Sequence, residues 1–147
     1  MPDVYSITHL IQLAVAPVFL LTGVGAMLSV LTMRMSRVVD RGHVIVKTVK
    51  NTDSTLQDFK EEIQALKTRS EFIHRSIIFC SLTAFFICLV IMTIFAANFI
   101  QAKLGVLVAG LFGLAMLSFI ISLVYFLREV AISSHSIELA LSELYKK

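Results

Sequence analysis

The chain of 147 residues has little charge, two prolines, two cysteines and no tryptophan. Only 16% of its residues are charged and 57% are hydrophobic, whereas a soluble domain has about 25% charged and about 45–50% apolar residues. So few charges cannot cover an aqueous surface, and the composition therefore indicates a membrane protein. Three apolar stretches of about 24 residues fill roughly half the length, which excludes a separate soluble domain with a core of its own.

Signals for catalysis and metal binding are also missing. The histidines are scattered, with no pair at a metal-binding spacing on one helix, and there is neither a glycine-rich phosphate loop nor a nucleophile elbow. We therefore expect no enzyme, no catalytic residue, no cofactor, no metal site and no nucleic-acid partner.

The two cysteines are expected to be structural. Cys80 and Cys88 are eight residues apart, about 12 Å along a helix, which is too far for a disulfide within one chain. We expect both to be small buried residues.

Three apolar stretches have the length of transmembrane helices. Residues 10–33, 77–100 and 104–127 contain no Asp, Glu, Lys or Arg, and each exceeds the about 20 residues that cross a hydrocarbon core. The link 101–103 is short enough to force spans two and three into an antiparallel hairpin. Ion-coupled transport is disfavoured because it normally requires ionisable groups at membrane depth. The sequence thus predicts an all-α integral membrane protein with one membrane domain over residues 1–147.

The basic residues predict the orientation of the spans. Nine of the 13 Lys and Arg lie between the first and second spans, three follow the third span, and one lies in the link 101–103. Because positive residues stay on the cytoplasmic side, the N-terminus is expected outside and the C-terminus in the cytoplasm. A cleaved signal peptide is the competing interpretation of the first stretch, but residues 1–9 contain no basic residue.

The segments outside the spans have a helical periodicity of their own. Residues 34–75 are expected to form a cytosolic helical hairpin, with a possible break at Gly42 and a capping-box spacing at Ser54 and Gln57. The spacing of apolar residues in 128–147 predicts a C-terminal cytosolic amphipathic helix. The second arm of the hairpin repeats apolar residues in steps of three and four, a coiled-coil pattern that can pair within a chain or between chains. This cytosolic seam consists of Leu56, Phe59, Ile63, Leu66 and Ile73.

Small residues follow one face of the first and third spans. Helices associate in a bilayer by close packing, which small residues permit, although the same residues can also fill contacts within one monomer. Pro17 predicts a kink in the first span. The run 22–25 (TGVG) invites comparison with carbonyl-lined cation filters, but it lies within a continuous helical pattern, which disfavours that function. The candidate residues for helix packing or pore lining are Pro17, Thr22, Gly23, Gly25, Ser29, Gly105, Ala109 and Gly113.

A basic cluster follows the first span directly. Arg34, Arg37 and Arg41 share one helical face, and Asp40 is close enough in sequence to pair with one of them. Such cations attract anionic lipid headgroups, and this is the favoured interpretation. The alternative is that they line a cytoplasmic vestibule in a ring of subunits and favour anions.

The first span and the arginine segment after it show a family resemblance. Residues 11–26 read IQLAVAPVFLLTGVGA, and they are followed by Leu28-Ser29-Val30-Leu31 and by Val38-Val39-Asp40-Arg41. In these residues, and in its layout of three spans with a charged insertion, the chain resembles the bacterial membrane family catalogued as domain of unknown function 2721. The resemblance implies a protein of the bacterial inner (plasma) membrane and brings no activity with it. It also implies that function or assembly depends on Pro17, Gly23, Gly25, Arg34, Arg37, Asp40 and Arg41.

Two functions from different classes fit these patterns. The first is a self-associating structural or interaction protein, which contacts the lipid bilayer and presents cytosolic helices to other copies or to a cytosolic protein partner. The alternative is a homo-oligomeric ion channel or pore lined by the first transmembrane helix. Cysteines placed along the first span would distinguish them, because only a water-filled pore exposes that span to water-soluble thiol reagents.

Overall fold

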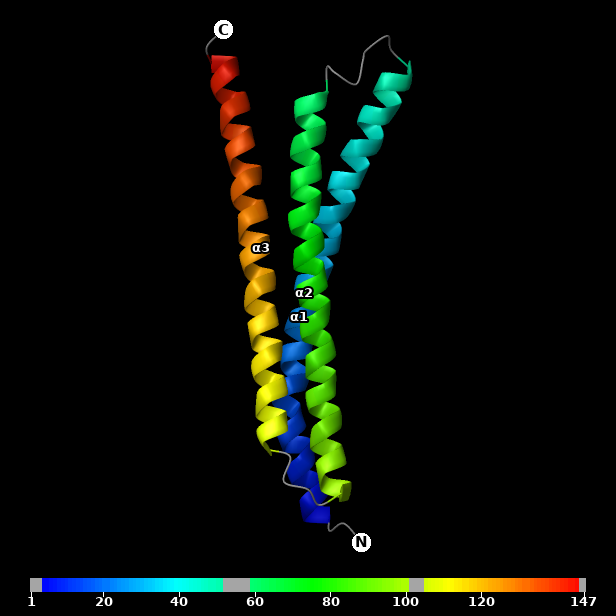
Figure 1. The fold of residues 1–147 in the computed structure, drawn as a ribbon, viewed down its shortest axis with the longest axis vertical. Helices are drawn as coiled ribbons and strands as arrows, with labels where there is room; N and C mark the ends of the chain where they lie inside the picture. The colour runs from blue at the N-terminus through cyan, green and yellow to red at the C-terminus, as the bar shows by residue number, and fades with distance from the viewer. Residues whose placement is uncertain (1–3, 52–58, 101–104, 146–147) are drawn as a thin grey trace. The chain divides into compact units, whose positions relative to one another are not determined.

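The computed structural model describes the backbone of residues 4–51, 59–100 and 105–145, and most side chains within 11–49, 59–97 and 105–132. The described chain is all-α, as predicted, with three long helices (Figure 1). They are α1 (Val4–Asn51), α2 (Lys60–Ile100) and α3 (Gly105–Tyr145).

Each helix is longer than a membrane requires. The 48 residues of α1 extend for about 72 Å, against about 30 Å for a hydrocarbon core. Each helix also contains a stretch that is long and apolar enough to cross a membrane, within Ile11–Val49, Glu62–Ala97 and Gly105–Ile132. The chain is therefore a multi-pass membrane protein with three candidate spans.

The helices run without interruption through positions where the sequence offers a break. α1 continues through Pro17 and through Gly42, the possible break in the hairpin. The turn of the predicted hairpin, with Ser54 and Leu56, lies outside the described residues. The predicted C-terminal helix is continuous with the third span in α3, and the side chains that would make it amphipathic also lie outside the described residues.

The chain forms two compact units, and each of the three helices contributes to both. Unit 1 consists of Met1–Ser29 and Ile78–Ile121. Its core contains Val24, Ile87, Val90 and Ala115, which are at most 1% exposed. A hydrogen bond joins α3 to α2 in this unit, where the Ser118 hydroxyl donates to the carbonyl of Phe79 at 2.9 Å.

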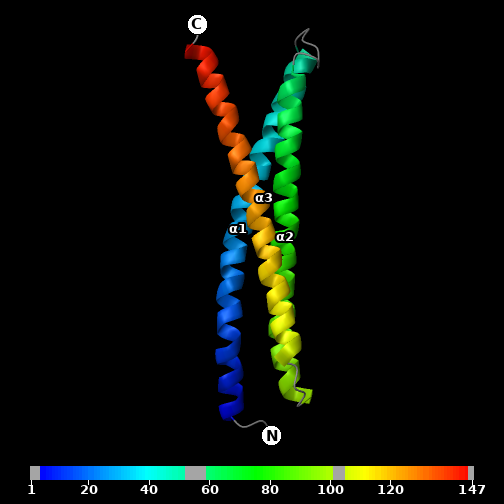
Figure 2. The ribbon, with the colours of Figure 1, turned by 60° about the vertical axis from the view of Figure 1, so that its left-hand side comes forward.

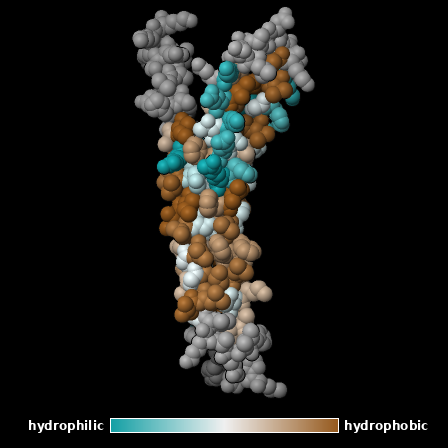
Figure 3. All heavy atoms as spheres, viewed as in Figure 1, coloured by the Kyte–Doolittle hydropathy of each residue, from teal (hydrophilic) through white to brown (hydrophobic). Residues whose placement is uncertain are grey.

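Unit 2 consists of Val30–Ile77 and Ser122–Lys147. Leu31 and Ile73 are fully buried in it, and so are three polar residues, Ser76, Ser122 and Glu129. On the face drawn in Figure 3, the hydrophilic side chains gather on this unit, whereas the described side chains of unit 1 are mainly hydrophobic. Figure 2 shows the same three helices from a second direction.

Large apolar side chains face outward along unit 1. Phe19 is 74% exposed, Met92 71% and Val106 88%. A soluble monomer rarely exposes contiguous apolar surface on this scale, so these side chains are suited to contact with lipid.

The two cysteines differ in burial, which corrects the expectation that both are buried. Cys80 is fully buried, with its Sγ 3.6 Å from the carbonyl oxygen of Val24, whereas Cys88 is exposed. Eight residues of α-helix rotate a side chain by about 80°. Cys88 therefore points away from the core that surrounds Cys80.

Candidate functional site

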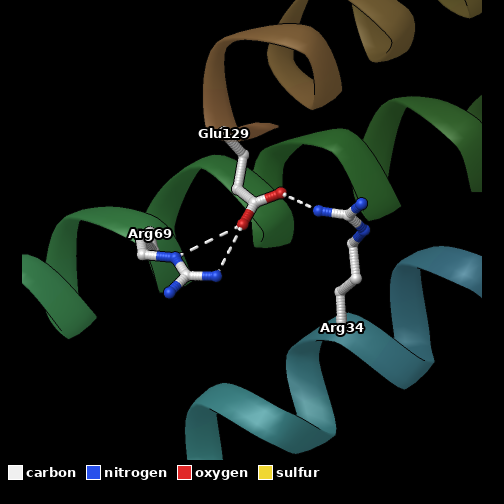
Figure 4. Close-up of polar contacts among 3 residues, drawn as sticks. All are labelled: Arg34, Arg69 and Glu129. Carbon is white, nitrogen blue, oxygen red and sulfur yellow. Dashed lines mark hydrogen bonds and ion pairs between the residues drawn. The ribbon is translucent and has the colours of Figure 1, made fainter. Parts of the chain in front are cut away.

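Three charged side chains from the three helices of unit 2 meet at one carboxylate. Glu129 of α3 is fully buried and lies between Arg34 of α1 and Arg69 of α2 (Figure 4). Nη1 of Arg34 donates to Oε2 of Glu129 at 2.9 Å. Nε and Nη2 of Arg69 donate to Oε1 at 3.3 and 3.1 Å. We call these three residues the Arg–Glu–Arg triad.

The two arginines of the triad compensate the buried negative charge of Glu129. Removing a carboxylate from water costs several kcal/mol even after relaxation, so a buried acid requires opposite charges and hydrogen bonds on its oxygens. Both oxygens of Glu129 accept from a guanidinium, and the arginines remain 37% and 29% exposed. One carboxylate against two guanidiniums leaves one positive charge in excess, on groups that still reach solvent.

Aromatic side chains of α3 support the neighbouring cations. The guanidinium of Arg34 lies 5.0 Å from the ring centre of Phe126, and that of Arg75 lies 5.9 Å from Tyr125. Both are within the range of a cation–π interaction. The guanidinium of Arg34 thus contacts α3 through both Glu129 and Phe126.

A reciprocal serine pair joins α2 and α3 about two helical turns from the triad, since Ser76 and Ser122 are each seven residues from the triad member of their helix. The hydroxyl of Ser76 donates to the carbonyl of Ser122 at 2.9 Å, and the hydroxyl of Ser122 donates to the carbonyl of Ser76 at 2.8 Å. Both residues are fully buried. Small side chains let the helix backbones approach, and the two hydrogen bonds fix the relative position of α2 and α3.

The predicted basic cluster is divided in the structure. Arg34 belongs to the triad, whereas Arg37 and Asp40 are exposed. Nε of Arg41 donates to Oε1 of Glu62 at 2.6 Å, so Arg41 forms its ion pair with α2.

The small residues of the first and third spans lie on the outside of the bundle. Pro17 is buried, but the other candidates are exposed, and a Cβ atom built on any of the glycines meets no heavy atom within 4 Å. The exposed candidates are Thr22, Gly23, Gly25, Ser29, Gly105, Ala109 and Gly113.

The cytosolic seam is only partly covered by the helices of its own chain. Ile73 is fully buried, Phe59 and Leu66 are half-buried, and Ile63 is 38% exposed. Leu56 lies outside the described residues.

Comparison with known proteins assigns the chain to a family. A family model described as "Protein of unknown function (DUF2721)" matches residues 14–139. The chain belongs to this family. No curated protein and no solved structure matches it. The DUF2721 match covers part of α1 and α3 and all of α2, and it includes every member of the triad.

The sequence pointed to Arg34 but not to the other two members of the triad in this DUF2721 protein. Glu129 lies two residues beyond the predicted end of the third span, and Arg69 lies between Leu66 and Ile73 of the cytosolic seam without being part of its apolar pattern. One signal in the sequence could have indicated Glu129. It is an acidic residue just after the third apolar span, and its charge is opposite to that of the arginines that follow the first span. Among the described residues, no group of three His, Cys, Asp or Glu is placed to hold a metal ion.

Proposed function

We propose that this DUF2721 protein is a self-associating protein of the bacterial inner membrane that presents cytosolic helices. The observation that carries this proposal is the outward position of the small residues on α3. Gly105, Ala109 and Gly113 recur every four residues on one face and are exposed. Lipid tails gain nothing from such a face, whereas a second helix can approach it closely.

The first span supports the same function. Thr22, Gly25 and Ser29 form a second exposed face of small residues on α1. The hydroxyl of Thr22 donates to the carbonyl of Val18 in its own helix at 3.3 Å. Its polar group is thus satisfied without water, which favours a helix contact over a wet pore.

The triad holds the three helices of each copy together in the part that we propose to be cytosolic. In the proposed orientation the N-terminus is outside, the C-terminus is cytoplasmic, and unit 2 includes the cytosolic helical hairpin and the C-terminal amphipathic helix. Because Glu129 binds arginines of both other helices, the cytosolic part of each copy is held as one bundle rather than as separate helices. A preorganised bundle loses less entropy when it binds another copy or a protein partner.

The test is the mass of the protein in a lipid nanodisc, with the lipid contribution subtracted. The wild-type chain is expected to be an oligomer, and Gly113→Leu is expected to dissociate it because the larger side chain blocks close approach. Gly110→Leu is a matched control, since Gly110 is also exposed and free of contacts but lies about 60° around α3 from Gly113. A monomeric wild type, or equal dissociation by both variants, would overturn the proposal.

A pore lined by α1 is the second candidate, and the exposed face of Thr22, Gly25 and Ser29 is the observation that favours it. Cysteines at these positions would react with small water-soluble thiol reagents in a pore, whereas a cysteine at the exposed residue Phe19 would serve as the lipid-facing control. Uniform protection at all four positions would eliminate the pore and leave the packing function.

A further inference from the structure

Two exposed arginines of unit 2 lie beside the contact between α2 and α3, where the predicted spans end. Arg75 lies two residues before the second predicted span, and Arg128 directly follows the third. Within the part of the chain that the structure describes, neither arginine forms an ion pair with an acid. In contrast, Arg34 and Arg41, which the sequence favoured for contact with lipid headgroups, are each paired with a glutamate.

The two arginines lie next to one pair of aromatic rings. The rings of Phe72 on α2 and Tyr125 on α3 lie 6.3 Å apart, and the guanidinium of Arg75 lies 5.9 Å from the ring centre of Tyr125. Arg128 is one turn from Tyr125 and about 60° around α3 from it, whereas Phe126, which contacts α1, lies about 100° from Tyr125 in the opposite sense. Arg128 is therefore on the side of Tyr125 that faces away from α1.

The register of α2 and α3 brings the two guanidiniums toward each other. Each helix has seven residues between its member of the triad and its member of the serine pair, so both contacts follow one antiparallel register. In this register Arg128 lies five residues, or about 7.5 Å, from Arg75 along the helix axes. Side chains lean toward the N-terminus of their own helix, so in this antiparallel pair each arginine leans toward the level of the other.

This pair of arginines is suited to bind a phosphate group. A guanidinium offers two parallel N–H donors to phosphate oxygens, and its contact with an aromatic face leaves these donors available at the edge. Glu71 is an exposed acid one turn before Arg75. Two guanidiniums and one carboxylate leave one positive charge in excess, which favours an anion at this site.

We propose that Arg75 and Arg128 bind the phosphate of one anionic phospholipid beside the ring of Tyr125. Two observations favour a lipid over a free phosphate. The arginines lie where the predicted spans end, which is the level of the headgroups, and Val124, one turn before Arg128 and inside the third predicted span, is 46% exposed and can contact an acyl chain. The proposal goes beyond the proposed function, because a single copy contains the whole site.

The test is native mass spectrometry of the full chain in detergent, titrated with phosphatidylglycerol. The dissociation constant of the first bound lipid is the quantity to compare. Arg75→Gln and Arg128→Gln are each expected to raise it about fivefold, because a basic residue at an anionic lipid surface contributes about this factor. Phosphatidylcholine, which carries no net charge, is expected to bind more weakly to the wild type and equally to both variants.

Arg37→Gln is the matched control. Arg37 is an exposed arginine close to the end of the first span, and it has an acid, Asp40, within one turn, as Arg75 has Glu71. General attraction between basic residues and anionic lipid would make the effects of Arg37→Gln and Arg75→Gln equal, and that result would overturn the proposal. We expect Arg37→Gln to change the dissociation constant little.

Glu71→Gln provides a second test, because misfolding cannot produce its expected effect. Removing this carboxylate should lower the dissociation constant for phosphatidylglycerol, and an unchanged or higher value would contradict the excess positive charge of the site. Inorganic phosphate distinguishes the two sources of the anion. If inorganic phosphate at the concentration of the lipid displaces phosphatidylglycerol from the wild type, the lipid is not the ligand and the proposal is overturned.

Discussion

Neutralising Glu129 is the most direct test of the triad. Glu129→Gln keeps the shape and one carbonyl oxygen but removes the charge that accepts three hydrogen bonds from Arg34 and Arg69. Hydrogen bonds to charged groups contribute about 1.5–3 kcal/mol each. The side chains of Arg34 and Arg69 are 37% and 29% exposed, so in the variant their guanidiniums form hydrogen bonds with water again. These new hydrogen bonds offset much of the free energy lost with the three bonds to Glu129. We expect the free energy of unfolding to fall by about 2–4 kcal/mol, near the range for breaking a buried ion pair.

The assay is an equilibrium titration with sodium dodecyl sulfate in mixed micelles, read by pulse proteolysis. Glu62→Gln is the matched control because it neutralises the same residue type in the ion pair with Arg41, where both side chains are more exposed. Exposed pairs contribute about 0–1 kcal/mol, so the control should change little. If Glu129→Gln and Glu62→Gln differ by less than about 0.5 kcal/mol, the account of the triad as a buried, desolvated cluster is wrong.

Replacing the whole triad separates the cost of an unpaired charge from the net value of the cluster. The combination Arg34→Met, Arg69→Met and Glu129→Leu removes all three charges and keeps apolar volume. A buried ion cluster is often no more stabilising than well-packed apolar residues. We expect the triple variant to be more stable than Glu129→Gln, in the same titration. A triple variant that is less stable than Glu129→Gln would show that the cluster contributes net stability.

Three further predictions concern packing, burial and orientation. Ser76→Leu should overfill the fully buried contact with Ser122 and lower the free energy of unfolding by about 1–3 kcal/mol in the same titration; an unchanged value would contradict the close approach of α2 and α3. Exposed Cys88 should react with a small membrane-permeant thiol reagent in the folded protein, whereas buried Cys80 should react only after unfolding, and equal rates by mass spectrometry would refute their different burial. With the N-terminus outside, a cysteine at the exposed position Thr48 should resist a membrane-impermeant thiol reagent on intact cells and react after permeabilisation, and labelling of intact cells would reverse the orientation.

Local properties of the sequence were enough to predict the fold class and the candidate spans. The apolar stretches 10–33, 77–100 and 104–127 lie within or overlap the three long helices, because length and apolar composition alone decide whether a helix can cross a bilayer. The predicted hairpin and the amphipathic C-terminal helix depend on residues whose placement or side chains are not described, and they stay predictions.

The sequence by itself determined that this is an all-α, multi-pass membrane protein of the DUF2721 family, with its charges gathered outside three apolar spans. Only the tertiary structure decided which side chains face inward. Arg34 and Arg69 are 95 and 60 positions from Glu129, and they meet it because of the rotation and axial register of three helices. A register shift of one residue turns a helix face by about 100°, so no local pattern could specify the triad, the different burial of the two cysteines or the outward face of Gly105, Ala109 and Gly113.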